Sequence, residues 1–271
     1  YLILIYIVKK TFDYYSSNFI NLSFVQFHDI EKLEIEKFNI IDISKNLKIS
    51  RETARRKISE LERDGIIQKN KKKLLVKRGA LKFQKPVIVL KHIIKFLNKV
   101  SKICVKNSIL NDELSKAQLE KTIHEKFSYI WKLWYEMLIP NLITWKKIHK
   151  DLESYHIFGT IVLNQTYETN KYLSKKKFNI NNRIEYVHFV QNFNEKTGIN
   201  AMSIANLTGI PRATVIRKLK VLIKKKVLHI DEKKHYHLYI KELKNYITAH
   251  NNVIIRLSNF TTQIFNLTRF N

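Results

Sequence analysis

NIIDISKNLKISRETARRKISELERDGII occupies residues 39–67 of the chain, and NAMSIANLTGIPRATVIRKLKVLIKKKVL occupies residues 200–228. These two stretches of 29 residues align without a gap at a shift of 161 (200 − 39). A self-match at one fixed shift indicates a duplicated structural unit. Identical residues occupy eight positions: Asn39/Asn200, Ile43/Ile204, Ile49/Ile210, Arg51/Arg212, Thr53/Thr214, Arg56/Arg217, Lys57/Lys218 and Leu61/Leu222.

Each copy predicts two helices that are joined by a tight turn. Asn39 and Asn200 are suited to cap the first helix, because an amide oxygen can accept a free backbone N–H there. Gly209 falls in the turn of the second copy, where a left-handed residue is needed. Ser50 is a typical cap for the second helix of copy one, and Pro211 suits a helix start because of its fixed φ.

The second helix of each copy has one apolar side, which is followed by a predicted β-hairpin. Because the apolar stripe packs inward, the Arg and Lys residues between its members must face outward. The hairpins have polar turns at 70–73 and 232–234, and Gly65 ends the second helix of copy one. The apolar stripes consist of Ala54, Ile58 and Leu61 in copy one and of Val215, Leu219 and Leu222 in copy two.

Together these pieces resemble a winged helix-turn-helix. The stretch SRETARRKISELERDGII at 50–67 resembles the DNA-reading end of Crp/Fnr-type regulators, whose recognition helix starts Ser-Arg-Glu-Thr and carries an Arg three residues after the Thr. The resemblance implies that two Arg and the Glu read base edges and that the Thr holds a phosphate. The matching residues are Ser50, Arg51, Glu52, Thr53 and Arg56.

Copy two resembles the IclR/MarR-type version of the same motif, through IANLTGIPRATVIRKLKVL at 204–222. It keeps Arg212, Thr214 and Arg217 but has Ala213 where copy one has Glu52. The two resemblances cover roughly a quarter of the chain.

The chemistry of these residue types agrees with DNA reading. A helix in the major groove presents its first turn to the bases. Arg fits the two acceptors of guanine, Glu accepts from cytosine N4, and Ala can contact a thymine methyl. We therefore predict base readers at Arg51, Glu52, Arg56, Arg212, Ala213 and Arg217. We predict phosphate contacts at Ser50, Thr53, Arg55, Lys57, Lys71, Lys72, Lys73, Thr214, Lys218, Lys233 and Lys234.

The net charge supports a polyanionic partner. The formal charge is +27 and the pI is about 10.0, which is typical of a nucleic-acid-binding chain. The chain is also rich in Ile, Asn and Lys, as AT-rich coding makes it, so part of the Lys excess carries no functional information. The arginines carry more functional information, because AT-rich coding works against them. Four of them fall in one predicted helix: Arg51, Arg55, Arg56 and Arg63.

Several function classes find no support in the sequence. There is no nucleophile motif, no metal-ligand spacing and no convincing acid/base pair of carboxylates, so we expect no enzyme and no cofactor. His229, His235 and His237 alternate in the second hairpin, but no Cys or carboxylate completes an evident set, so we expect no metal. Cys104 is the one cysteine, and no apolar run is long enough to span a bilayer. We expect a cytoplasmic, nucleoid-associated protein without a membrane partner.

The expected architecture is mainly α with small β-hairpin wings. It divides into an N-terminal helix plus the first winged helix-turn-helix (1–80), a helical connecting region (81–180), a second winged unit (181–240) and a C-terminal helix (241–271). The periodicity predicts helices over 1–18, 22–36, 86–106, 142–173 (with a break near Gly159), 182–195 and 241–268, and one more that begins at Asn111 or Asp112 and is closed by Pro140.

The long helices that follow each winged unit resemble those that build MarR-like dimers. A duplicated chain could therefore be a pseudo-dimer within one polypeptide, and the long helices could also support self-association. Trp131, Trp134, Tyr135 and Trp145 lie near Pro140 and leave a small-molecule effector pocket open as an alternative to a packed core.

The function that the sequence favours is sequence-specific binding of double-stranded DNA through two recognition helices, as in a transcriptional regulator. A Rep-type plasmid replication initiator with two winged helix domains is one alternative. A non-specific architectural or scaffold protein is the other.

Overall fold

The computed structural model is mainly helical, with 72% helix in 12 helices and two small three-stranded antiparallel sheets in the part described. It describes residues 1–35, 39–70, 73–77, 79, 86–178, 180, 182–193, 197–239 and 243–270. The chain divides into two compact units. Unit 1 is Tyr1–Ile143 with Asn252–Asn271, and unit 2 is Thr144–Asn251.

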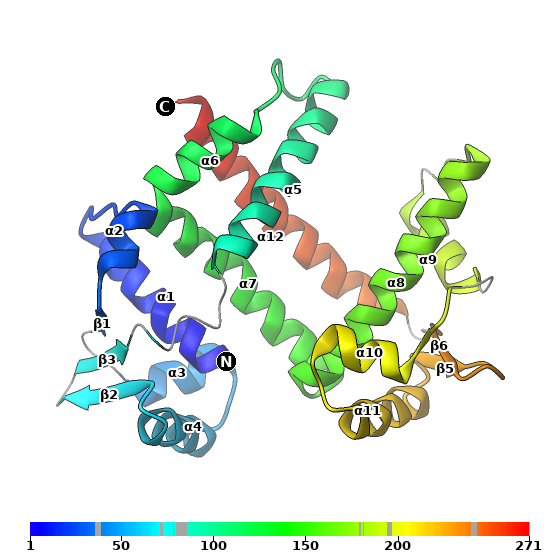
Figure 1. Cartoon of the computed structure of the whole chain (residues 1–271), viewed down its shortest axis with the longest axis horizontal. Coiled ribbons are helices and arrows are strands. Elements are labelled where there is room, and N and C mark those ends of the chain that lie inside the picture. The colour runs from blue at the N-terminus through cyan, green and yellow to red at the C-terminus, as the bar shows by residue number, and fades with distance from the viewer. Residues whose placement is uncertain are drawn as a thin grey trace. The chain divides into compact units, whose positions relative to one another are not determined.

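Unit 1 is built around helix α1 (Leu2–Ser17), which packs against α3 (Ile40–Leu47), α4 (Arg51–Arg63) and β1 (Lys32–Ile35). Every residue from Leu2 to Val8 is buried, because α7 covers another side of α1, where Phe12 and Tyr135 have ring centroids 6.0 Å apart. The elements of unit 1 are α1 (Leu2–Ser17), α2 (Phe24–Asp29), β1 (Lys32–Ile35), α3 (Ile40–Leu47), α4 (Arg51–Arg63), β2 (Ile67–Asn70), β3 (Lys73–Lys77), α5 (Pro86–Lys106), α6 (Lys116–Glu125) and most of α7 (Phe127–His149), as Figure 1 shows.

Unit 2 is built in a related way around α8 (Leu152–Lys176), which packs against α10 (Ala201–Thr208), α11 (Arg212–Lys224) and β6 (His235–Leu238). Its apolar core joins Ile157 and Ile161 of α8 to Ile204 of α10 and to Val215 and Leu219 of α11. The elements of unit 2 are α8 (Leu152–Lys176), α9 (Arg183–Asn192), β4 (Ile199–Asn200), α10 (Ala201–Thr208), α11 (Arg212–Lys224), β5 (Leu228–Ile230), β6 (His235–Leu238) and the first part of α12 (Leu243–Arg269).

The two units share one order of elements. In each, two helices, a strand, two helices and a hairpin are followed by a long helix. The strand orders are β1-β3-β2 and β4-β6-β5, so the second hairpin strand is central in both sheets. Two left-handed positions also match at the shift of 161: Lys48 (φ 50) with Gly209 (φ 69), and Gly65 (φ 68) with Lys226 (φ 55). The chain therefore follows the same local path in both copies.

The third strand of each sheet was not predicted. The helix expected over 22–36 ends at Asp29, and Lys32–Ile35 forms β1. Leu33 and Ile35 are buried while Lys32 and Glu34 are exposed, an alternation that suits a strand paired to β3. The helix expected over 182–195 likewise ends at Asn192, before β4.

The predicted helices between the copies also need correction. The helix expected from Asn111 or Asp112 begins after Ser115, which forms a capping box with Gln118. It ends at Glu125, and α7 then runs through Pro140 to His149.

Pro140 was expected to close a helix, because a helix-interior Pro costs about 3 kcal/mol. Tyr135, Met137, Ile139 and Asn141 are buried around it, and this packing outweighs the lost hydrogen bond. The next helix was expected to start at Leu142 with a break near Gly159. It starts instead at Leu152, after the Asp151 cap, and continues unbroken through Gly159.

The other predicted helices are confirmed. These are α1, α5 and α12, together with the helix pairs α3–α4 and α10–α11 of the two copies. Asn39, Ser50 and Asn200 cap their helices through side-chain hydrogen bonds. Among the residues that the structure describes, no helix is both long enough and apolar enough to cross a membrane.

The core of unit 2 encloses His149, which is 2% exposed. Its ring stacks on Trp145 and lies 4.5 Å from the ring of Phe158. Neither ring nitrogen has a hydrogen-bond partner among the described residues. Burial, aided by the charge of Lys225, lowers the pKa of His149 from 6.5 to about 4. The imidazole is therefore neutral at neutral pH.

The left-handed residues give a first prediction. Lys226→Gly should raise the free energy of unfolding by about 0.5–1 kcal/mol, because Gly adopts positive φ without a Cβ penalty. Gly65→Ala should lower it by about 1 kcal/mol, since φ is +68° there although no atom lies within 4 Å of the added Cβ. Urea unfolding measures both. Gly159→Ala, inside α8, is the matched control and should be stabilising by about 0.5–1 kcal/mol; a loss of stability there would contradict the assigned cause.

His149 gives a second prediction. The unfolded imidazole takes up a proton near pH 6.5 and the folded one near pH 4, so the unfolded state binds more protons between these values. The free energy of unfolding should therefore fall as pH drops from about 6.5 to about 4, by about 3 kcal/mol in all. Thermal unfolding against pH measures this. His149→Leu should flatten the dependence, whereas His156→Leu, at an exposed position, should keep it. Equal slopes in both variants would disprove the role of His149.

Candidate nucleic-acid interface

The first turn of α4 is held by its cap. Ser50 Oγ accepts from the backbone N–H of Thr53 at 3.1 Å and donates to Thr53 Oγ1 at 2.8 Å. The Thr53 hydroxyl therefore accepts from Ser50 and keeps its own hydrogen for another acceptor. Both predicted phosphate contacts thus lie together at the helix start, where the free N–H groups and the helix dipole favour an anion.

Burial of one side of α4 determines which of its residues are exposed on the other side. Ala54 and Ile58 have no exposed surface, so the predicted base readers Arg51, Glu52 and Arg56 are exposed, as their burial shows. Within the described part of the chain, Arg51 has no ion-pair partner. The structure therefore brings the three predicted readers of copy one to one solvent-facing surface.

Glu60 organises two of the outward cations of α4. It accepts from Arg56 at 2.9 Å and from Lys57 at 2.6 Å. The hydrogen bond from Lys57 lowers the pKa of the Glu60 carboxyl. The Arg56 side chain is still 62% exposed, so the pair orients the guanidinium along the helix without covering it. Arg55, also exposed, has no ion-pair partner among the described residues.

Helix α11 repeats this arrangement with different chemistry. Val215, Leu219 and Leu222 are fully buried, and the predicted readers Arg212, Ala213 and Arg217 are exposed. Thr214 is half-buried, like Thr53. Pro211 precedes the helix and provides no side-chain cap.

The charge of the two helices differs. The three Glu residues of α4 are replaced in α11, so that Glu52, Glu60 and Glu62 correspond to Ala213, Val221 and Ile223. Helix α4 has five cations and three anions, a net charge of +2 (5 − 3). Helix α11 has five cations and no anion, a net charge of +5. Arg217 consequently has no carboxylate one turn away. Lys220, an exposed cation of α11, was missed in the sequence, although the lack of acidic residues around it is visible there.

Lys218 does not face outward with the other cations. Its ammonium lies 2.7 Å from Asp151 and 3.5 Å from Glu153, and its side chain is only 16% exposed. Asp151 also caps α8 by accepting from the N–H of Ser154 at 2.7 Å. Burial opposes ionisation of Asp151, but the hydrogen bonds from Lys218 and Ser154 outweigh it and lower the pKa of the carboxyl. The structure thus uses Lys218 to join α11 to α8.

Unit 1 has a comparable tie at a different place. Asp42 of α3 accepts from the Tyr6 hydroxyl at 2.9 Å and pairs with Lys10 at 2.9 Å. Burial of Tyr6 and its hydrogen bond to Asp42 raise the pKa of the phenol. Both donors come from α1, so this tie holds α3 and leaves Lys57 of α4 exposed. Neither tie is visible in the sequence, because each joins residues far apart in the chain.

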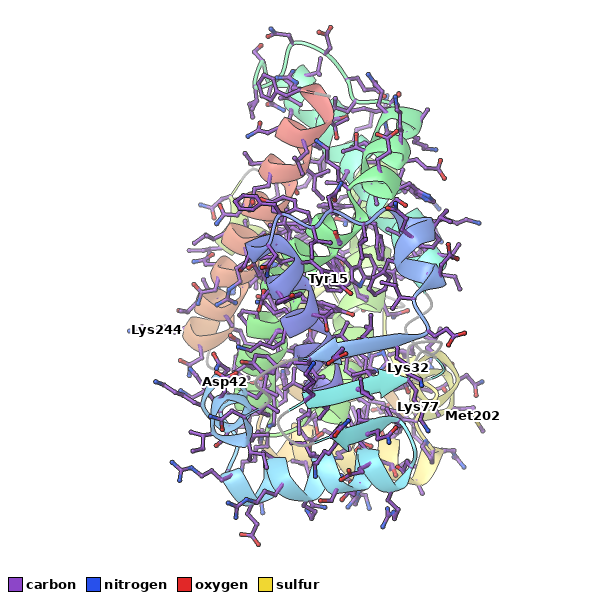
Figure 2. All side chains as sticks on the ribbon, turned by 90° about the vertical axis from the view of Figure 1, so that its left-hand side faces the viewer. Tyr15, Lys32, Asp42, Lys77, Met202 and Lys244 are labelled. Carbon is purple, nitrogen blue, oxygen red and sulfur yellow. The ribbon has the colours of Figure 1, made fainter. Side chains whose placement is uncertain are left out.

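The hairpin of copy one carries its own charges. Lys73 pairs with Glu34 of β1 at 2.5 Å, and Lys69 pairs with Glu62 of α4 at 2.9 Å. Lys32 and Lys77 are register partners on β1 and β3 and lie at neighbouring positions of the sheet (Figure 2). The predicted phosphate contacts Lys71 and Lys72 lie outside the described residues.

The hairpin of copy two is organised by Asp231. Its carboxylate accepts from the backbone N–H of His235 at 2.8 Å and contacts His237 Nε2 at 3.0 Å. The hydrogen bond from His237 and that from His235 lower the pKa of Asp231 to about 2. Lys233 and Lys234 are exposed at the hairpin tip, where both were predicted to meet phosphates.

The histidines of this hairpin pack together. His229 and His237 are register partners with ring centroids 4.8 Å apart. Gly198 allows the close approach of His237, because a Cβ at Gly198 would lie 2.5 Å from that ring. Among the described residues, no group of three or more His, Cys, Asp or Glu side chains is suited to hold a metal ion.

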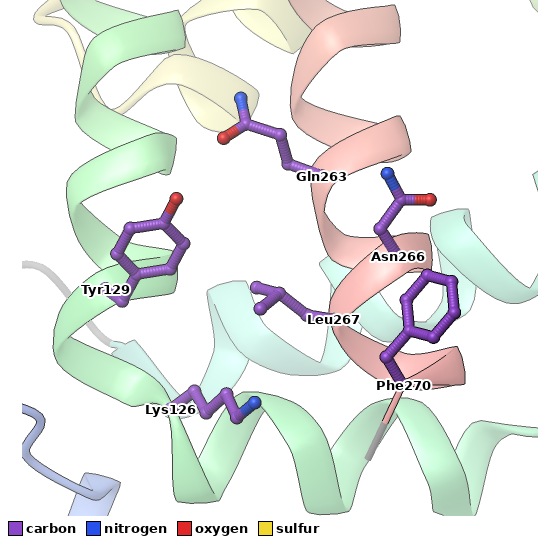
Figure 3. A pocket seen from close by; sticks show the side chains of 6 residues that line it. All are labelled: Lys126, Tyr129, Gln263, Asn266, Leu267 and Phe270. Carbon is purple, nitrogen blue, oxygen red and sulfur yellow. The ribbon is translucent and has the colours of Figure 1, made fainter.

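Of the aromatic residues near Pro140, Trp131 and Tyr135 are buried, and Trp134 and Trp145 are half-buried. Trp131 is 4% exposed and stacks on Phe127 at 5.1 Å, and Trp145 stacks on Tyr155 in unit 2 at 5.4 Å. A cavity of about 280 Å³ lies elsewhere in unit 1, between α7 and the end of α12 (Figure 3). It is lined by Lys126, Tyr129, Gln263, Asn266, Leu267 and Phe270.

The structure thus places all six predicted base readers on the exposed sides of α4 and α11, above apolar inward sides. Lys218, which was predicted to contact a phosphate, is instead paired with Asp151. Comparison of the chain with protein-family models, curated proteins and solved structures finds no match in any of the three.

The tie between α11 and α8 gives a third prediction. In a double-mutant cycle, Lys218→Met and Asp151→Asn should show a coupling energy of about 1 kcal/mol or more, because the lysine is mostly desolvated. Asn at 151 keeps a good cap, so the cycle isolates the ion pair. The exposed pair Lys57–Glu60 is the control and should couple by less than about 0.5 kcal/mol. Similar coupling in both cycles would show that Lys218 is not a tether.

Proposed function

We propose that this protein binds double-stranded DNA sequence-specifically, as a transcriptional regulator, through two winged helix-turn-helix units with α4 and α11 as recognition helices. One observation carries the proposal: arginines at matching positions, Arg51 with Arg212 and Arg56 with Arg217, are exposed on the first two turns of both helices. In each unit the helix follows a capped helix and a left-handed turn and precedes an antiparallel hairpin. That is the order in which a winged helix presents a helix to the major groove.

Each recognition helix would read a different set of bases. Arg51 and Arg56 can each bond guanine O6 and N7, and Glu52 can accept from cytosine N4. Arg212 and Arg217 offer the same guanine contacts, but Ala213 offers only a methyl for thymine. Because Glu52 and Ala213 stand at equivalent positions, the two half-sites should differ.

The phosphate contacts follow from the exposed cations and hydroxyls. Thr53 and Thr214 lie in the first turn, and Lys57, Lys73, Lys233 and Lys234 are exposed. Lys218 is left out, because its side chain is only 16% exposed where it pairs with Asp151, whereas Lys57 and Lys73 stay about half exposed in their own ion pairs.

Two units in one polypeptide would do the work of a dimer. Recognition helices ~34 Å apart meet successive major grooves on one face of the duplex. An intrachain pseudo-dimer of this kind has two unlike readers, so its operator need not be a palindrome. A Rep-type replication initiator would use the same contacts at repeated sites near an origin.

The uniform charge of α11 favours a second candidate, non-specific DNA binding in an architectural role. Helix α11 has no anion, and its four cations other than Lys218 are exposed, so it attracts any duplex through the DNA backbone. Selection of sites from a random duplex library at two salt concentrations distinguishes the candidates. A motif with two unlike half-sites ~10 bp apart that survives the higher salt supports the regulator. A featureless pool that is lost at higher salt supports the architectural role.

Substitutions test the assigned contacts. Arg56→Ala should weaken binding to the selected site by ~1–3 kcal/mol and relax the preference at one base pair. Lys233→Ala should weaken binding to all sequences about equally and lower the salt slope by about 1. Lys218→Met is the internal control, because a tether should leave the salt slope unchanged. Equal losses on every sequence for Arg56→Ala and Lys233→Ala would refute the assigned roles.

A further inference from the structure

Helix α5 exposes a straight row of lysines in unit 1. Lys91, Lys95, Lys99, Lys102 and Lys106 are all exposed and follow one another at steps of 4, 4, 3 and 4 residues. At ~100° per residue these steps keep the five side chains within one narrow sector of the helix over ~22 Å. We call this row the α5 ridge.

The ridge has almost no counter-charge of its own. Helix α5 contains no Asp or Glu. Of the five lysines, only Lys102 has a carboxylate within 4 Å among the described residues, that of Glu113 at 3.2 Å. Like charges at i,i+4 are destabilising in a helix by ~0.2–0.5 kcal/mol per pair. The bare protein therefore carries an unfavourable charge arrangement that an external polyanion would relieve.

The bias of the whole chain toward Lys does not explain this pattern. Helix α12 is longer and follows the second hairpin as α5 follows the first, yet its cations are only Lys244, Arg256 and Arg269. These three are 12 and 13 residues apart and form no row. Helices α7 and α8 carry Glu residues among their lysines. A row of five lysines without an acid is particular to α5 among these long helices.

One side of α5 is fixed by packing. Leu90, Ile93 and Leu97 are buried. The amide of Asn98 donates to the carbonyl of Leu114 at 2.8 Å, and Ser101 Oγ accepts from the N–H of Leu114 at 3.3 Å. These contacts hold α5 against the segment that leads into α6, so the ridge is presented on a rigid support.

The ridge and α4 lie apart within unit 1. In Figure 1, α5 lies beside α6, at the end of unit 1 away from α3, α4 and the sheet, and the view in Figure 2 agrees. The two helices thus lie at different ends of unit 1, and we assign the ridge an anionic partner of its own.

We infer that the α5 ridge binds the phosphate backbone of a duplex segment other than the one that α4 reads. This rests on the proposed DNA-binding function and adds a second, sequence-independent contact to it. Lysines spaced along ~22 Å can follow a row of phosphates, and a contact of this kind releases counterions. Helix α5 buries Leu90, Ile93 and Leu97 but leaves Val87, Ile88, Phe96 and Ile103 exposed, so an anionic membrane is the competing partner. The arrangement of the charges in one row of ~22 Å favours a line of phosphates.

The test is the salt dependence of binding to a long duplex of mixed sequence. The variant Lys91→Gln, Lys95→Gln, Lys99→Gln and Lys106→Gln removes four ridge charges. The slope of log K against log salt is negative, and each lost phosphate contact lowers its magnitude by about 0.9. We therefore expect the magnitude of the slope to fall by about 3 to 4 in this variant. The matched control changes four exposed lysines elsewhere, Lys116, Lys121, Lys171 and Lys244, to Gln, and should lower the slope by less than about 1. Four Lys→Arg changes in the ridge should keep the wild-type slope and show that charge, not folding, is responsible.

Two results would overturn the inference. One is an equal slope for the ridge variant and the control. The other is a ridge variant that keeps its slope on DNA but loses binding to vesicles of phosphatidylserine and phosphatidylcholine, since the partner is then a membrane. Site selection with the wild-type chain separates the two proposals: without a selected motif the regulator proposal fails, while a ridge-dependent slope would still support the ridge.

Discussion

The inward apolar stripes of α4 and α11 are the constraint on which the candidate interface depends. Ala54 and Ile58 in unit 1, and Val215 and Leu219 in unit 2, have no exposed surface. With 3.6 residues per turn, burying these positions leaves no freedom in where their neighbours point. The arginines at 51, 56, 212 and 217 are exposed as a consequence of packing. Their exposure needs no ligand to explain it, but it makes them available to one.

The same path of the chain is stabilised by different chemistry in the two units. Unit 1 ties α1 to α3 through Asp42, whereas unit 2 ties α8 to α11 through Asp151 and Lys218. The second tie removes one cation from the outward surface of α11, although Lys57 and Lys218 are identical in the aligned sequences. Sequence identity between two copies therefore does not imply the same role, because the role depends on which carboxylate lies opposite.

Features formed by residues close together in the sequence were predicted well, whereas contacts between residues far apart in the sequence were not predicted. The helix pairs of both copies follow from caps, left-handed turns and stripes that lie within a few residues of one another. Strand β1 was missed because its pattern of Lys32, Leu33, Glu34 and Ile35 becomes a strand only by pairing with β3, some forty residues later. Asp151 was missed because its partner lies 67 residues away. The prediction that Pro140 ends a helix was wrong for the opposite reason. The local effect of the proline was outweighed by the burial of its neighbours on α7.

The distribution of carboxylates suggests how affinity and specificity are divided along the chain. A Glu on a recognition helix repels phosphate and accepts only from particular bases, so it lowers general affinity and rejects wrong sequences. Helix α4 has three such residues and pairs two of its cations with one of them. Helix α11 and the α5 ridge have none. If the proposed function holds, α4 supplies discrimination, while α11 and the ridge supply salt-dependent attraction. The two copies then make the same kinds of contact but differ in how much each contributes to discrimination between sequences and to salt-dependent attraction.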